Sequence, residues 1–536
     1  MPTIHEYEKT LREMVSTLNL SITSPKEKPR EKELGDFRII SAAKIMSELE
    51  TGNTAFVADT GTGKTIVSFL IFLFLHRNEK KRTLFLVPQV VLAGQHNVLL
   101  NGVAKEHSPS SLIITGATKQ KNRDWKSPSI IFATPQTFFK EYSKGTAKIN
   151  DFHFVVFDEF HRGQGKYDYV PIANLFKENN VPILLLSASP GGNKEKIAKV
   201  KNTFGIKHWV RGMVAMPEKE ENILIVKPDE TLENIDKHFL SMFRSAENQL
   251  VALKLLKNNF SSKETQIEMF ALPEIEAKPQ ILPIKKLEEI KDEIFKLPTR
   301  KRYEAFSIYG IYMKLRYAYG TCMTEGYETF LYYIGKLKEK DRKDQIKSKG
   351  ELKTTTHRFL THPRMESVIQ LAEDNRDYHP KVQKLISLIR FFTNRRGLIF
   401  VGEKETGLCL NRRLSKFGIS TEVLFGGRGK SIKHQNHVIS SLMNGTLNFA
   451  VSTSVVKEGL NIPEMDVVVH YSLSKTGIEL IQGNGRIGRT YPGKIYFIVL
   501  DHFLDRSMYW STKRQVQTMN RIVGSKNIYE PTFSFI

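Results

Sequence analysis

The segment "ADTGTGKT", residues 58–65, lies between two apolar runs and combines glycines with a lysine and a threonine. Gly61 and Gly63 allow backbone N–H groups to turn toward phosphate oxygens, and a helix starting nearby would present its positive end to them. Lys64 can reach the β- and γ-phosphates of a nucleotide, and the hydroxyl of Thr65 can hold Mg²⁺. The spacing therefore predicts a P-loop. The residues expected to bind nucleotide there are Asp59, Thr60, Gly61, Thr62, Gly63, Lys64 and Thr65.

A second segment, "VVFDEFHRG" at residues 155–163, ends an apolar run in two adjacent carboxylates. Asp158 would bind Mg²⁺, and Glu159 would orient and deprotonate the water that attacks the γ-phosphate. An acidic pair at a strand end is more often a helix cap or a solvated turn when it occurs alone. Its position downstream of a P-loop favours the metal and base roles.

A third segment, "QGNGRIGRT" at residues 482–490, carries Gln482 and two arginines three positions apart. On a helix, Arg486 and Arg489 would share one face, so both could meet the γ-phosphate as negative charge develops. A pair of surface arginines is the alternative. If the functional interpretation holds, the nucleotide site is built between two parts of the chain and completed when they close.

The elements that must position these segments fall into three stretches. From residue 37 to about 216, short apolar runs alternate with polar stretches long enough for helices, which is typical of parallel strands in an α/β sheet. Helical spacing then replaces the strand-like runs, and the α/β alternation returns from about 380 to 499. We predict an α/β fold with two parallel-sheet domains and a helical domain inserted between them. The expected boundaries are 1–36 for an N-terminal extension, 37–226 for the first domain, 227–376 for the insert, 377–500 for the second domain and 501–536 for a basic helical tail.

The composition indicates a polyanion partner. The chain has 536 residues and a formal net charge of +23, and each phosphate that a cation neutralises releases counterions, although a basic surface can also serve solubility alone. The two cysteines exclude a four-thiolate zinc site and suggest no disulfide framework. A cytoplasmic location is therefore expected, at the nucleoid in a prokaryote. The longest apolar run, 66–75, is too short to cross a bilayer, so no membrane contact is expected.

Taken together, the motifs resemble those of superfamily 2 nucleic-acid helicases from about residue 37 to about residue 514. "DEFH" is similar to the DExH box, "LLLSASPGG" (184–192) to the third motif and "STSVVKEGLNIPEMD" (452–466) to the fifth. "YWSTKR" and "MTEGYETFLYYIGKL" resemble segments of the archaeal Hef helicase module, whose eukaryotic relatives include the FANCM translocase. The RIG-I-like and Dicer helicases are more distant relatives. The resemblance implies two RecA-like domains with ATP and Mg²⁺ as cofactors.

The resemblance also implies roles for residues beyond the P-loop and the acidic pair. His161, Ser187 and Gln482 would couple the state of the nucleotide to the bound strand. Arg486 and Arg489 would be the γ-phosphate sensor and the arginine finger.

Further positions would contact the nucleotide from the second half or the nucleic acid. Gly459 and Asn461 belong to the fifth motif, beside the ribose. The residues expected to contact the phosphate backbone of one strand are Gln95, Gly116, Thr134, Gln136 and Thr453. For each threonine, a simple turn residue is the alternative.

Four positions depart from the family pattern. Ala58 stands where the usual P-loop has its first glycine, and Ser41 or a neighbour stands where the family has an adenine-reading glutamine. Asn461 replaces an aspartate that helps to hold the ribose, and Gly483 replaces an arginine that links the two halves. The expected enzyme is an active ATPase with weak selectivity among nucleotides.

The leading functional hypothesis is an ATP-dependent DNA helicase or translocase that remodels forked or branched DNA in repair or fork restart. The alternatives are an RNA or RNA–DNA helicase, and an ATP-gated clamp that binds nucleic acid without unwinding it. No acidic nuclease motif is found, so a nuclease would be a separate partner, and a monomer is expected. The aromatic residues between Arg300 and Gly320 favour a helix-bundle core over a base-stacking surface, because their spacings of three and four are helical.

Overall fold

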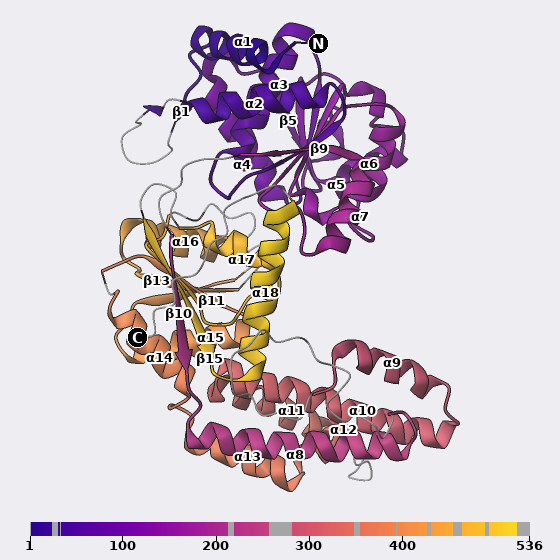
Figure 1. Ribbon diagram of the computed structural model, residues 1–536, viewed down its shortest axis with the longest axis vertical. Coiled ribbons are helices and arrows are strands. Elements are labelled where there is room, and N and C mark those ends of the chain that lie inside the picture. The colour runs from indigo at the N-terminus through magenta and orange to yellow at the C-terminus, as the bar shows by residue number, and fades with distance from the viewer. Residues whose placement is uncertain are drawn as a thin grey trace.

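The chain folds into three parts arranged along one long axis, with the first parallel-sheet domain at one end, the second in the middle and the helical insert at the other end (Figure 1). This confirms the predicted fold class. The computed structural model describes residues 2–23, 31–32, 34–212, 219–256, 281–347, 354–392, 394–425, 430–453, 462, 464–487 and 492–522.

The first domain is a parallel sheet in the order β5-β6-β4-β7-β8-β3-β9. Successive side chains of a strand point to opposite faces. Phe56 therefore packs under α1–α4, whereas Ala55 packs under α5–α7. The strands are β3 (Asn53–Val57), β4 (Thr83–Leu86), β5 (Ser111–Ile114), β6 (Ile130–Ala133), β7 (Phe154–Asp158), β8 (Ile183–Ser187) and β9 (Ile206–Arg211). The helices are α1 (Ile4–Thr17), α2 (Asp36–Leu49), α3 (Lys64–Glu79), α4 (Val90–Ala104), α5 (Pro135–Ser143), α6 (Tyr169–Glu178) and α7 (Lys194–Phe204), with short turns η1 (Lys105–His107), η2 (Gln120–Asn122), η3 (Ile149–Asp151) and η4 (Phe160–Arg162).

The N-terminal residues belong to this domain and do not form a separate extension in the described part. Leu11 and Met14 of α1 are buried in the same core as the P-loop helix α3. A small antiparallel pair, β1 (Ile22–Thr23) and β2 (Glu31–Lys32), follows α1.

The second domain is a parallel sheet in the order β10-β15-β14-β11-β13-β12. Helices α16–α18 cover one face, and α14, α15 and the insert cover the other. Its strands are β10 (Lys219–Val226), β11 (Gly397–Val401), β12 (Thr421–Leu424), β13 (Phe449–Thr453), β14 (Val467–His470) and β15 (Gly493–Leu500). Its helices are α14 (Pro380–Arg390), α15 (Lys404–Lys416), α16 (Lys430–Asn444), α17 (Gly477–Asn484) and α18 (Phe503–Ile522).

Strand β10 corrects the predicted domain boundary at residue 226. The prediction placed residues 219–226 in the first domain, but β10 pairs in parallel register with β15 over its full length. Figure 1 shows this magenta strand among the orange and yellow strands of the second sheet. The apolar pattern of a strand reveals its burial but not the sheet it joins, so the sequence placed the boundary one strand too late.

The insert is a bundle of helices whose core is continuous with the second sheet. Tyr312 and Tyr319 are fully buried, which confirms the core interpretation for these two aromatics, whereas Tyr303 is 74% exposed. A single hydrophobic cluster joins insert residues to Val469 and Ile498 of the second sheet. The insert consists of α8 (Glu230–Ala252), α9 (Ile284–Phe295), α10 (Thr299–Gly320), a π-helical turn η5 (Thr321–Glu325), α11 (Tyr327–Lys347), α12 (Thr355–Leu360) and α13 (Pro363–Asp374).

Buried polar contacts reinforce the junction between the insert and the second domain. Ser472 donates a hydrogen bond of 2.5 Å to Glu325 at the end of η5, and burial raises the pKa of that carboxyl. Nearby, Lys381 of α14 and Asp505 of α18 form an ion pair of 2.8 Å with almost no solvent exposure. Such groups are stable in the interior only when they are paired, so the junction is specific as well as apolar.

None of the helices in the described ranges combines the length and the apolar character needed to cross a membrane.

Candidate nucleotide site and nucleic-acid interface

The P-loop connects β3 to α3 with the backbone geometry that the sequence predicts. Gly61 and Gly63 adopt φ values of +87° and +93°, a left-handed conformation that glycine adopts without strain. The Nζ atom of Lys64 reaches back across the loop to the carbonyl oxygens of Ala58 (2.8 Å) and Asp59 (3.1 Å). The loop is therefore tightly wound, with Lys64 and Thr65 in the first turn of α3.

Asp158 is the last residue of β7, and contacts on several sides fix its position. One carboxylate oxygen accepts the backbone N–H of Glu159 at 3.1 Å, and the other lies 3.0 Å from Nε2 of His96. The hydroxyl of Tyr169 donates to the backbone carbonyl of Asp158 at 2.7 Å. The side chain and main chain of this residue are thus oriented by the protein alone.

Glu159 combines a strained backbone with a stabilised charge. Its φ and ψ of 51° and 49° are left-handed, which is uncommon for a residue with a side chain and is often seen at functional sites. Burial would raise its pKa, but hydrogen bonding and charge from His161, together with Lys64 and Ser187, outweigh burial and lower the pKa of Glu159 to about 2. The carboxylate is therefore ionised at neutral pH, the state in which it can accept hydrogen bonds from the attacking water.

His161 and Ser187, the two residues predicted to couple nucleotide to strand, are in direct contact. Ser187 is the last residue of β8. Nδ1 of His161 lies 2.9 Å from the hydroxyl of Ser187 and 3.3 Å from the Glu159 carboxylate. The hydroxyl of Ser187 also lies 3.2 Å from that carboxylate. The structure thus joins the DEFH segment to the SASPGG segment at the atoms expected to act on water.

The residues of this site fit Mg²⁺. Within the described ranges, no group of three or more His, Cys, Asp or Glu side chains is placed to hold a metal ion by itself. Mg²⁺ is usually held by one or two protein oxygens, with phosphates and water supplying the rest. Asp158 and the hydroxyl of Thr65 are such oxygen donors. They follow the carboxyl ends of β7 and β3, which emerge at the same edge of the sheet because both strands are parallel to β8 between them.

The second domain approaches the P-loop directly. A Cβ atom placed on Gly485 would lie 2.4 Å from the Cβ of Thr60, so the backbone at Gly485 touches the loop. Gln482 on α17 and Arg486 just after it are buried. The predicted site residues Arg489, Gly459 and Asn461 lie outside the described residues.

Helix α18 provides a second bridge between the domains (Figure 1). Its Gln515 accepts the backbone N–H of Gly477, the first residue of α17, at 3.0 Å. One turn further, the hydroxyl of Ser189 donates to the sulfur of Met519 at 2.8 Å. The helix therefore connects the arginine-bearing segment to the SASPGG loop of the first domain.

The residues predicted to contact nucleic acid differ in accessibility. Gly116 and Gln136 are exposed, Gln95 is half-buried, and Thr134 and Thr453 are buried. Thr134 lies 2.9 Å, hydroxyl to hydroxyl, from Thr137 at the start of α5. This geometry favours the turn alternative for the Thr134 side chain and leaves Gly116 and Gln136 as the accessible candidates.

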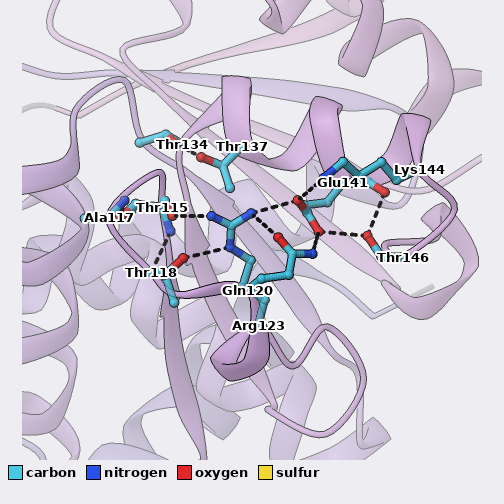
Figure 2. A network of polar contacts seen from close by, with 10 residues as sticks. All are labelled: Thr115, Ala117, Thr118, Gln120, Arg123, Thr134, Thr137, Glu141, Lys144 and Thr146. Atoms are coloured by element: carbon cyan, nitrogen blue, oxygen red, sulfur yellow. Dashed lines mark hydrogen bonds and ion pairs between the residues drawn. The ribbon is translucent and has the colours of Figure 1, made fainter.

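A buried ion pair holds the loop that carries Gly116. Figure 2 shows Arg123 between this loop and helix α5. Its guanidinium donates to the backbone carbonyl of Thr118 (2.9 Å) and to the Glu141 carboxylate (2.7 Å), which is completely buried. Gln120 also donates to Glu141, at 3.0 Å. The pair therefore fixes the loop relative to α5, whose N-cap is Thr134.

Sequence reasoning missed two residues at this site, His96 and Arg38. The Arg38 guanidinium donates to the carbonyl of Leu34 at 2.7 Å and lies over the ring of Phe37. A Cβ on Gly63 would be 2.6 Å from its Nε atom, so Arg38 lies against the P-loop, and burial lowers its pKa. The signal in the sequence that could have found Arg38 is a cation shortly before a P-loop.

Two sequence profiles and several known proteins match this chain. Residues 31–191 match the family described as type III restriction enzyme, res subunit, and residues 380–491 match the helicase conserved C-terminal domain. A protein of Methanocaldococcus jannaschii, provisionally named an ATP-dependent RNA helicase, is 25% identical over 94% of this chain and 62% of its own length. The ATP-dependent DNA helicase fml1 of Schizosaccharomyces pombe is 24% identical over 83% of this chain and 55% of its own length. The chain thus spans less than two thirds of these relatives.

A solved structure extends the similarity to the fold. The helicase domain of Pyrococcus furiosus Hef has a TM-score of 0.62 and 27% identity, and covers 88% of this chain and 97% of its own. Two parallel-sheet domains with a P-loop, an acidic strand end and an arginine-bearing segment at their junction define a tandem RecA-like helicase core. Both parallel-sheet domains thus match helicase families, and the fold is similar to that of the Hef helicase domain. These similarities, with those to the DNA helicases of fungi, confirm the resemblance to superfamily 2 helicases of the Hef and FANCM-like type found in the sequence.

Proposed function

We propose that this chain is an ATP-dependent DNA helicase or translocase that acts on forked or branched DNA. The observation that carries the proposal is the direct approach of Gly485 to Thr60, which puts Arg486 of the second domain beside the P-loop of the first. A nucleotide site that needs both domains can convert hydrolysis into relative domain motion. The relatives named DNA helicases support the choice of DNA.

The residues of the first domain would divide the chemistry among them. Lys64 would bind the β- and γ-phosphates, and Glu159, ionised and held by His161 and Ser187, would orient the attacking water. Asp158 and Thr65 would hold Mg²⁺, which would neutralise charge on the phosphates.

The second domain would complete the site. Arg486, and Arg489 with it, would stabilise negative charge on the γ-phosphate when the domains close. Gln482 would couple this closure of the domains to the bound nucleic-acid strand. Gly459 and Asn461 would lie near the ribose.

Nucleic acid would bind to two parts of the chain. The first domain would contact one strand, and the insert would contact a second arm of the branch. Gly116 and Gln136 would contact the phosphates of the tracked strand, with Gln95, Thr134 and Thr453 shaping the path. The insert lies at the far end of the second domain (Figure 1), so it would meet a different arm of a branch and not the strand in the cleft. Exposed Arg300 and Lys301 at the start of α10 would supply charge there.

An ATP hydrolysis assay with single-stranded, duplex, forked and RNA ligands in parallel tests the proposal. The expected order has forked DNA as the strongest activator, with Lys64→Ala as the inactive control. Hydrolysis stimulated by RNA and not by DNA would overturn the choice of DNA. The same assay with GTP in place of ATP tests the weak selectivity among nucleotides, which is expected because Ser41 or a neighbour replaces the adenine-reading glutamine. Arg38 is the remaining candidate to contact the base.

An RNA helicase is the second candidate, and the Methanocaldococcus jannaschii relative with that provisional name favours it. An ATP-gated clamp is a third, because Gly483 removes an expected link between the halves. Strand separation measured together with hydrolysis distinguishes a helicase from a clamp. We further propose that the chain acts as a monomer in the cytoplasm, at the nucleoid in a prokaryote, with any nuclease as a separate partner.

A further inference from the structure

His96 connects helix α4 to the acidic end of β7. Its Nε2 atom lies 3.0 Å from Oδ2 of Asp158, and each of the two side chains is only 10% exposed. An ionised carboxylate can only accept hydrogen bonds, so Nε2 must carry the proton and donate it. Asp158 is the residue proposed to hold Mg²⁺, and none of the roles assigned above explains this contact.

Three phenylalanines fix the orientation of the His96 ring. Phe69, Phe85 and Phe132 approach it edge to face, with centroid separations of 6.4, 5.3 and 6.4 Å. They come from α3, β4 and β6, so the ring lies where the P-loop helix, the sheet and α4 meet. A ring held in this way can present its N–H in one direction only.

The carboxylate of Asp158 is consequently restrained at both oxygens. Oδ1 accepts the N–H of Glu159 and Oδ2 accepts the N–H of His96. Each oxygen retains lone-pair capacity for a further partner. Groups that orient a metal-binding side chain from behind usually raise metal affinity, because the ligand does not need to reorganise.

We propose that His96 is a positioning residue for the metal-binding carboxylate of Asp158. This inference rests on the proposed function, since it assumes that the site binds nucleotide together with Mg²⁺. The adjacent residue on α4, Gln95, is a candidate contact for the bound nucleic-acid strand. Two consecutive residues of this helix would therefore link the nucleic acid to the carboxylate that holds Mg²⁺. The competing explanation is that His96 only satisfies a buried carboxylate and contributes stability.

The test measures how strongly Mg²⁺ tightens the binding of a fluorescent, slowly hydrolysed ATP analogue to the full chain. Affinity is measured with Mg²⁺ and with EDTA, and the ratio of the two is compared among variants. His96→Leu keeps the apolar packing and loses the donor, and His96→Asn keeps an amide that is too short to reach Asp158. Both should lower the ratio by about 10-fold, the usual cost of removing such a partner. His96→Gln retains a donor near the original position and should restore most of it.

His208→Leu is the matched control, because His208 forms a comparable contact of 2.8 Å with the carboxylate of Glu48 in the same domain. His208 lies on β9 opposite the start of β3 and not opposite the end of β3 that leads into the P-loop. An unchanged ratio in His96→Leu and His96→Asn, or an equal fall in the control, would overturn the inference. Failure of the wild-type protein to bind the analogue more tightly with Mg²⁺ would instead count against the proposed function. If His96→Leu does not fold, the contrast between His96→Asn and His96→Gln decides the matter.

Discussion

At the residue scale, hydrolysis should depend on Glu159 while nucleotide binding should not. The carboxylate lies within 3.3 Å of both His161 and Ser187, and its charge is stabilised there. We expect Glu159→Gln to bind ATP normally and to lower kcat by about 10²-fold or more, the scale of a positioned base. Steady-state hydrolysis and analogue binding measured on the same preparation check this. Near-normal turnover would remove Glu159 from the role.

The residues at this site also show how far sequence reasoning can reach. Lys64, Asp158 and Glu159 were predictable because their chemistry follows strand ends and a glycine-rich turn. His96 was not, because an apolar helix with one histidine gives no sign of the strand end that it faces. Arg38 had a signal in the sequence, a cation shortly before a P-loop, but its contact with the backbone at Gly63, 25 residues away, forms only in the fold.

At the scale of the elements, the Arg123–Glu141 pair should set the position of the Gly116 loop against α5. Arg123→Ala would remove the guanidinium from a fully buried carboxylate that keeps contacts with Gln120, Thr146 and Lys144. The cost should therefore lie below that of an uncompensated buried charge, about 3–5 kcal/mol. We expect a lower unfolding temperature and weaker binding of single-stranded DNA, with partial recovery in Arg123→Lys.

The control for this pair is Arg12→Ala, which breaks partly exposed bridges to Glu8 (2.8 Å) and to Asp36 (2.5 Å) in the same domain. An exposed pair of this kind contributes about 0–1 kcal/mol, so little change is expected. If Arg123→Ala destabilised the domain without changing DNA affinity, the pair would be structural only.

The helices and strands themselves were largely predictable from the sequence, but which strands pair in a sheet was less so. The period of apolar residues identified the parallel strands of both halves, because each is a short buried run between polar stretches. The same signal misassigned β10, since pairing with β15 joins residues 219–226 to residues 493–500. Contacts between such distant segments depend on the whole topology and not on the local pattern.

At the scale of the whole molecule, the insert cannot be tested by removing it. Its core is continuous with one face of the second sheet, so excision would expose apolar surface there and unfold more than the insert. Charge reversal at exposed Arg300 and Lys301 is the better experiment. We expect Arg300→Glu with Lys301→Glu to lower affinity for forks relative to linear duplex, measured by titration of both. Equal affinities in variant and wild type would show that α10 does not contact a second arm.

The net charge of +23 predicts that DNA binding depends strongly on salt and weakly on sequence. Because neutralised phosphates release counterions, a plot of log K against log salt for duplex DNA should fall with a slope of about −0.9 per phosphate contacted. Binding titrations at several salt concentrations, on two unrelated sequences, give this slope. A flat response, or a strong preference for one sequence, would be inconsistent with contacts to the backbone.

The substitution Arg486→Ala tests whether the second domain completes the nucleotide site of the first. Arg486 is buried and follows Gly485, whose backbone touches Thr60 of the P-loop. The measurement is DNA-stimulated ATP hydrolysis by the variant and the wild type, with analogue binding as the control for folding. If the second domain does complete the site, we expect the variant to retain nucleotide binding and to lose about 10³-fold or more of its stimulated kcat. Stimulated hydrolysis at the wild-type rate would show that Arg486 of the second domain takes no part in the reaction.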